Sequence, residues 1–239
     1  MIKYVPPYKQ GRFEYLIELI LALNQILKFT KMKRYFLKFL WIIVVILALL
    51  VGYIPIDYLL HGIAKGYLDL KTQAVLSSTV WKFFLYIHIS SGGIAILIGW
   101  IQFSKFLQKK YINFHRIIGK VYLISAIICS ISGIYVGFFA TGGLIAVAGF
   151  ITVACLYFHT TLQGFLTIKK GQIVQHQNFM TYSYALCLSA VSLRLSTTTV
   201  YLTGLDYVSS YQVIAWTAWL PNLIIAYWIN KNNSFHLTS

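Results

Sequence analysis

Acidic residues are scarce in this chain, which has five Asp and Glu against 20 Lys and Arg among its 239 residues. Only 10% of the residues are charged and 59% are hydrophobic, whereas a soluble domain has about 25% charged residues. This composition excludes a soluble globular protein. It predicts an integral membrane protein whose main partner is the lipid bilayer.

Cysteine and known catalytic motifs are also sparse. The three cysteines, Cys129, Cys155 and Cys187, form no C-x-x-C pair and fall inside apolar runs, so we expect them to be small packing residues. The sequence contains no Ser-His-Asp set, Walker loop, H-E-x-x-H motif or Gly-rich dinucleotide turn. We therefore expect no hydrolase, kinase or dinucleotide chemistry and no metal site, while electron transfer of the oxidoreductase type stays open.

Apolar runs of about 20 residues, long enough to cross the hydrocarbon core as helices, occur six times in the sequence. They lie near 35–56, 80–103, 116–139, 143–167, 179–202 and 211–230. The predicted fold is an all-α bundle of six transmembrane helices. Its parts are an amphipathic N-terminal segment at 1–34, a first transmembrane helix at 35–56, an outer loop at 57–79, a five-helix membrane core at 80–230 and a tail at 231–239.

Basic residues gather at every second connection between these runs. They precede the first run, surround the turn between the second and third, separate the fourth from the fifth and follow the sixth. By the positive-inside rule these segments, and with them both termini, are cytoplasmic. Because topology accounts for the positive charge, we expect no nucleic-acid partner. We expect the protein to lie in a bacterial cytoplasmic (inner) membrane as a multi-pass protein.

The first apolar run follows Met32 and has the basic flank of a signal peptide. No A-x-A cleavage site follows it, so we expect a retained span. Residues 1–34 then form either an amphipathic helix on the inner surface or an extension from an upstream start. The sequence leaves open whether Met1 or Met32 is the native start.

Histidines lie on small or polar stripes of four successive runs, at helical spacing: His88, His115, His159 and His176. Small residues let membrane helices approach closely, so we expect these stripes to face the interior of the bundle. His115 and His176 share one layer near the predicted cytoplasmic side. His88 shares the outer half with Arg194, and His159 lies at a different depth from the others.

Four segments together resemble a known family: "HISSGGIAILIGWIQF", "FHRIIGKVYLIS", "HQNFMTYSYALCLSAVSLRL" and "WLPNLIIAYWI". In this order and spacing they are similar to the predicted bacterial membrane proteins grouped as domain of unknown function 2306. The resemblance covers about residues 80–230. The resemblance implies that His88, His115, His176 and Arg194 are marked positions, whereas at His159 the family more often has an aromatic or aliphatic residue. It implies no established activity.

Three functions remain open from the sequence. In the first, His115 and His176, with His88 as a further candidate, bind haem b or another redox cofactor for transmembrane electron transfer. In the second, the chain is a structural or assembly protein without a cofactor. In the third it transports a small molecule, which is less favoured because no acidic residue lies in a span and Pro221 is the only helix breaker in one. Another membrane protein or a second copy of the chain stays open as a partner.

Arg194 is the only arginine inside an apolar run. Placing it there costs about 2.5–3.5 kcal/mol on insertion scales, so something must compensate. One interpretation is an ion pair at the outer rim with Asp206 or Asp57. The other is that Arg194 and His88 bind the carboxylate of a ligand or a small anion.

Overall fold

The computed structural model describes residues 32, 35–36, 38–62 and 71–235. Apart from Met32, the predicted N-terminal segment lies outside these residues. Within them the chain is helical, without a strand, and six helices are long and apolar enough to span a membrane. They are Lys38–His61, Thr79–Phe103, Ile112–Gly137, Gly143–Lys169, Ile173–Thr203 and Tyr207–Asn232. The all-α fold with six spans is thus confirmed, and the cytoplasmic side stays a prediction.

The chain forms two compact units, Met1–Ile46 and Leu47–Ser239, and the second contains the site described below. Its labelled elements are α3 (Gln73–Ser77), α4 (Thr79–Gly99), η1 (Trp100–Phe103), α5 (Lys105–Lys110), α6 (Ile112–Gly137), α7 (Gly143–Lys169), α8 (Ile173–Cys187), α9 (Ser189–Thr203), α10 (Tyr207–Thr217) and α11 (Leu220–Phe235). The second half of the helix Lys38–His61 also belongs to this unit.

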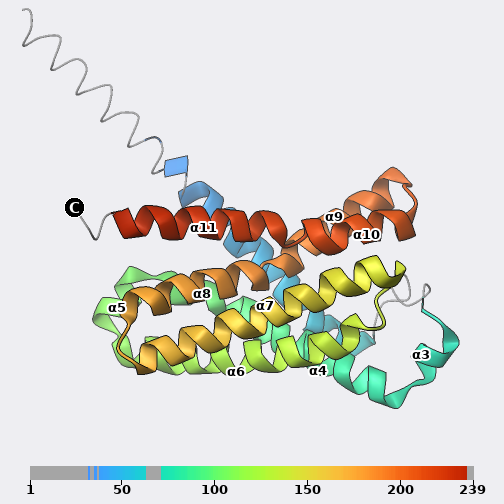
Figure 1. Cartoon of the computed structure of the whole chain (residues 1–239), viewed down its shortest axis with the longest axis horizontal. Helices are drawn as coiled ribbons and strands as arrows, with labels where there is room; N and C mark the ends of the chain where they lie inside the picture. The colour runs from blue at the N-terminus through green and yellow to red at the C-terminus, as the bar shows by residue number, and fades with distance from the viewer. Residues whose placement is uncertain (1–31, 33–34, 37, 63–70, 236–239) are drawn as a thin grey trace, which may run out of the picture. The chain divides into compact units, whose positions relative to one another are not determined.

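The second unit has two distinct ends. The short helix α5 and the α7–α8 turn lie at one of them (Figure 1), and both carry lysines: Lys105, Lys109, Lys110, Lys169 and Lys170. We call this the lysine-rich end. Figure 1 shows α3 and the α9–α10 turn at the other end, which we call the α3 end.

Both of the last two spans are interrupted along their length. The fifth changes from α8 to α9 at Leu188, and the sixth changes from α10 to α11 at Ala218 and Trp219. Asn222 of α11 donates to the carbonyl of Ala185 at 3.3 Å and to Oγ of Ser192 at 3.2 Å, one on each side of the first interruption. The two interruptions are therefore held against each other by one side chain.

Small residues determine which helix faces are buried. On α6 the predicted stripe is buried in part, with Tyr122, Ala126 and Cys129 each less than a tenth exposed. Methyl groups added at Gly149 and Gly164 of α7 would both overlap neighbours. At Gly149 the Cβ would lie 2.8 Å from the carbonyl oxygen of Ala215 in α10.

The prediction for α7 is wrong in one respect, because His159 and Cys155 are exposed on its outer face. The helix buries Gly149, Tyr157 and Gly164 instead. Glycine allows the closest backbone approach, so the face with the glycines contacts the neighbouring helices. His159 is left beside the ring of Phe179, at 6.5 Å between centroids.

Candidate functional site

A cavity of about 360 Å³ lies in the half of the bundle nearer to the α3 end. Its walls come from the helix Lys38–His61 and from α4, α6, α7, α8, α9 and α10. Pockets for small ligands have volumes of about 300–1,000 Å³. The cavity is thus large enough for one small organic molecule.

Three basic side chains line this cavity: Lys71, which precedes α3, His88 of α4 and Arg194 of α9. They come from segments far apart in the sequence. The sequence predicted His88 and Arg194 in the same half of the bundle, and in the structure both line the same cavity. Lys71 was not among the predicted site residues.

The imidazole of His88 is held by α6. Its Nδ1 lies 2.8 Å from the carbonyl oxygen of Cys129, and a carbonyl can only accept, so Nδ1 carries a proton and donates. A methyl group on Gly133 would lie 2.9 Å from Cε1 of the ring. The small stripe of α6 is therefore what admits the histidine, and Nε2 is the nitrogen that can change its protonation state.

Arg194 enters the cavity from α9, where it lies near an aromatic ring. Its guanidinium carbon is 5.9 Å from the ring centroid of Tyr58, a cation–π contact. Asp57, one of the predicted partners of Arg194, accepts a hydrogen bond from Nδ1 of His61 at 3.0 Å. The carboxylate of Asp57 therefore already has a donor on its own helix.

Asp206, the other predicted partner of Arg194, caps the N-terminus of α10. Its Oδ2 accepts from the backbone N–H of Ser209 at 2.8 Å. Hydrogen bonds from the backbone and side chain of Ser209 lower the pKa of Asp206 below its usual value. Both aspartates thus have local roles, and the ion pair at the rim stays a prediction.

Lys71 lies at the α3 end of the cavity, outside the spans. Its Nζ donates to the carbonyl of Phe139, near the turn between α6 and α7. Burial lowers the pKa of Lys71 below the usual lysine value. The sequence contained a signal for this residue. The positive-inside rule predicts few lysines in the outer loop at 57–79, so a lysine at position 71 departs from the rule.

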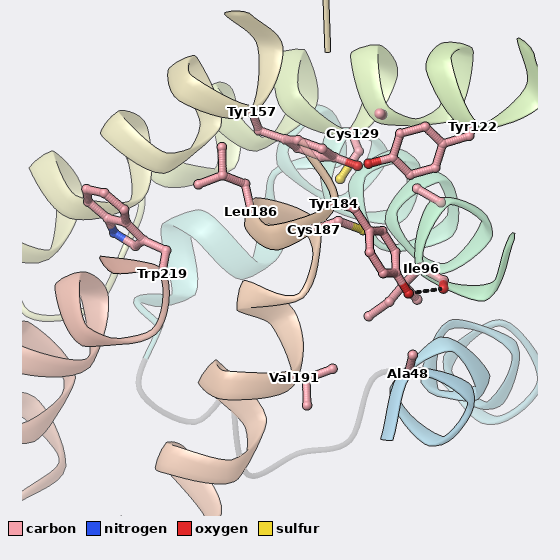
Figure 2. Close-up of a cluster of buried hydrophobic side chains, with 12 residues drawn as sticks. Ala48, Ile96, Tyr122, Cys129, Tyr157, Tyr184, Leu186, Cys187, Val191 and Trp219 are labelled. Carbon is pink, nitrogen blue, oxygen red and sulfur yellow. Dashed lines mark hydrogen bonds between the residues drawn. The ribbon is translucent and has the colours of Figure 1, made fainter. Parts of the chain in front are cut away.

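The deep end of the cavity carries two thiols and a phenol, from Cys129, Cys187 and Tyr157. Figure 2 shows the hydroxyl of Tyr157 pointing toward that of Tyr122, with both cysteines nearby. The hydroxyl oxygen of Tyr122 in turn lies 2.9 Å from Oγ of Ser183.

A cluster of hydroxyls continues from this point through three helices. Oγ of Ser183 in α8 lies 2.9 Å from the Tyr122 hydroxyl in α6 and 2.8 Å from Oγ1 of Thr161 in α7. All three residues are buried. We call this set the hydroxyl cluster. We call the part of the bundle next to the lysine-rich end the lysine-rich half.

His115 and His176 lie together in the lysine-rich half, close enough to interact electrostatically, as the sequence predicted. Nδ1 of His176 donates to the carbonyl of Gly164 at 2.7 Å. The amide of Gln102, oriented so that both of its ends are satisfied, donates to Nδ1 of His115 at 2.9 Å. Neither histidine is among the described residues that line the cavity.

These contacts give the two histidines different tautomers. With Nδ1 of His176 as the donor, Nε2 of the neutral ring carries the lone pair that a haem ligand requires. Nδ1 of His115 accepts from Gln102 in this orientation, so its Nε2 carries the proton. Haem ligation by the pair stays a prediction, and it requires Gln102 to turn its amide.

The comparison with known proteins gives one family. A family model described as "Predicted membrane protein (DUF2306)" matches residues 85–229, which include His88, His115, His176 and Arg194. No curated protein and no solved structure matches the chain.

Proposed function

Because the chain belongs to the DUF2306 family of predicted membrane proteins, whose description states no activity, we propose a function from the site itself. We propose that the protein binds a small organic anion in the cavity lined by Lys71, His88 and Arg194. The binding site then lies within the membrane and is reached from the α3 end.

The observation that carries this proposal is the convergence of three basic side chains on one cavity. The described residues that line it include no Asp or Glu. Arginine binds carboxylates and phosphates through a bidentate fork, and lysine adds a point charge. An anion in the cavity would therefore be attracted by basic side chains from segments far apart in the sequence.

A buried indole supports the same interpretation. Trp81 lines the cavity and is 3% exposed, and its Nε1–H has no hydrogen-bond partner among the described residues. Leaving a buried donor without an acceptor costs about 1–3 kcal/mol. A ligand oxygen near Trp81 would supply the missing acceptor.

The remaining walls favour a ligand with an apolar body. Most of the other lining side chains are apolar, and they include Ile96, Val153 and Leu186. Together with the basic side chains they suit a carboxylate or phosphate attached to a hydrocarbon or aromatic group. Benzoate is a suitable first probe, with inorganic phosphate as a probe of the charge alone.

The test is isothermal titration of the purified full chain in detergent micelles with benzoate and with phosphate. We expect saturable binding of at least one of them. Arg194→Gln and Lys71→Gln should each weaken it, the former by about tenfold to hundredfold, since hydrogen bonds to charged groups contribute about 1.5–3 kcal/mol. The matched control is Lys82→Gln, because Lys82 is exposed at the same end and does not line the cavity. Equal affinity in all four proteins would contradict the proposal.

A second candidate function is electron transfer through haem b held by His115 and His176. The proximity of the two imidazoles supports it. Its test is the absorption spectrum of protein purified from haem-replete cells. A Soret band that disappears in His115→Ala and His176→Ala would favour it over a structural role, and a colourless protein would rule it out.

A further inference from the structure

The tautomer of His88 leads to a more specific statement about the ligand, one that rests on the proposed anion binding. We infer that the cavity binds its anion together with a proton, which is taken up on Nε2 of His88. The site would then take in a weak acid as an electrically neutral pair.

The first step is the assignment of the nitrogens. The carbonyl of Cys129 can only accept, so the 2.8 Å contact fixes the proton on Nδ1 of His88. The ring packs against Gly133, where an added Cβ would lie 2.9 Å from Cε1 and 3.0 Å from Nδ1 of the imidazole. Nε2 is therefore the titrating atom of a side chain that lines the cavity.

The second step concerns the groups around His88. Among the described residues, and besides two tyrosines of α10, the other titratable or charged side chains that line the cavity are Tyr58, Lys71, Cys129, Tyr157, Cys187 and Arg194. Thiols and phenols ordinarily ionise only above neutral pH. Among the described residues that line the cavity, the charged side chains at neutral pH are thus Lys71 and Arg194, both basic.

The third step follows from Coulomb's law in a site of low dielectric constant. Burial disfavours the charged form of an imidazole, and basic side chains in the same cavity do not favour it, so without an anion His88 is neutral and Nε2 is an acceptor. An anion bound next to His88 stabilises the protonated imidazole and needs donors. A proton on Nε2 then supplies one more donor and offsets the charge that the anion brings.

The experiment counts protons during titration of the full chain with benzoate, whose carboxylate is ionised between about pH 6 and about pH 8. The apparent enthalpy is measured in two buffers of different ionisation enthalpy, and its dependence on the buffer gives the protons taken up. We expect about one proton per benzoate in the wild type. The affinity should fall by up to about tenfold per pH unit as the pH rises.

His88→Gln keeps an amide donor for the Cys129 carbonyl and removes the titrating nitrogen, so benzoate should bind without proton uptake. His159→Gln is the matched control, because His159 is exposed and does not line the cavity, and it should behave as the wild type. Persistent uptake in His88→Gln would overturn the inference.

A second measurement covers the case in which His88→Gln does not fold. The ¹⁵N spectrum of the wild type, labelled at histidine, should show one imidazole whose Nε2 changes from unprotonated to protonated on addition of benzoate. Benzoate binding with neither this change nor proton uptake would overturn the inference and leave the proposed function intact. If neither benzoate nor phosphate binds, the proposed function fails and the inference fails with it.

Discussion

His88, which lines the cavity, and His176, in the lysine-rich half, make the same kind of hydrogen bond. Each donates from Nδ1 to a backbone carbonyl of a neighbouring helix, at 2.8 Å to Cys129 and at 2.7 Å to Gly164. They differ in what lies beyond the bond. His88 borders a cavity of about 360 Å³ with two other basic side chains, whereas His176 lies beside His115 outside it.

This difference shows that a histidine inside a membrane bundle does not by itself mark a ligand-binding site. A hydrogen bond to a neighbouring helix is a structural contact that either histidine could provide. What distinguishes His88 is the cavity that it lines and the two other basic side chains that line the same cavity. The predictions below test whether the two halves differ in this way.

The largest effect should come from Gly133→Ala, compared with Gly119→Ala in the lysine-rich half. The new methyl group at 133 would lie 2.9 Å from the His88 ring, whereas at 119 it would meet only the end of Gln102 at 3.3 Å. We expect Gly133→Ala to weaken benzoate binding more than tenfold and to lower the free energy of unfolding by about 1–3 kcal/mol.

Titration calorimetry and thermal unfolding of both variants measure these effects, with Gly119→Ala expected to change the stability by less than about 1 kcal/mol. If Gly133→Ala binds benzoate as tightly as the wild type does, the close packing of His88 against α6 is not required for benzoate binding.

The next effect contrasts the two histidines directly. His88→Ala should lower benzoate affinity about tenfold through loss of one charge-assisted hydrogen bond. His176→Ala should leave the affinity unchanged and lower the free energy of unfolding by about 1–2 kcal/mol, because it removes the donor to Gly164. Both quantities are measured on both variants. A loss of benzoate affinity in His176→Ala would show that the two halves are coupled.

A smaller effect is expected from Ser183→Ala, in the hydroxyl cluster. Ser183 contacts Tyr122 and Thr161 at 2.9 and 2.8 Å, so the change removes two hydroxyl contacts. Polar contacts between membrane helices contribute about 0.6 kcal/mol each on average, which predicts a loss of about 1 kcal/mol. Thermal unfolding in detergent measures it, with Thr199→Ala, on the exposed face of α9, as the control. An equal loss in the control would mean that the hydroxyl cluster adds nothing specific.

The smallest effect is a pH dependence at alkaline pH. Lys71 attracts an anion only while protonated, and its pKa is lowered by burial, so benzoate affinity should fall at a lower pH than an exposed lysine near about 10.4 would give. The fall should be about fivefold or less, since Lys71 is only partly buried. Lys71→Arg should abolish this fall, because an arginine stays charged. If the fall persists in Lys71→Arg, another group causes it.

Much of the fold followed from hydrophobic runs and helical spacing. All six predicted spans exist as helices, although the first extends to His61 and the fifth begins at Ile173. His88 and Arg194 could be placed in one half by counting residues along their helices at about 1.5 Å each. The nearness of His115 and His176 followed in the same way.

Other features depend on contacts that no single helix shows. The interruption at Leu188 contains neither glycine nor proline, and Asn222, which bridges it, was not predicted although an amide in an apolar run is a signal of such a contact. His159 lies on a polar stripe of α7, but the adjacent stripe contains Gly149 and Gly164 and is the one that packs. Lys71 lines the cavity and donates to the carbonyl of Phe139, a contact 68 residues apart in the sequence that helical spacing does not show.

The bridge made by Asn222 also bears on how the chain enters the membrane during synthesis. The last two spans are the least apolar of the six and the first is the most apolar, so the late spans gain the least from partitioning into lipid one at a time. The bonds from Asn222 to Ala185 and Ser192 satisfy polar groups on both spans only when the two are adjacent. We therefore expect α8 to α11 to leave the translocon as a paired hairpin, with Asn222→Leu improving insertion of the last span alone while weakening its association with the fifth.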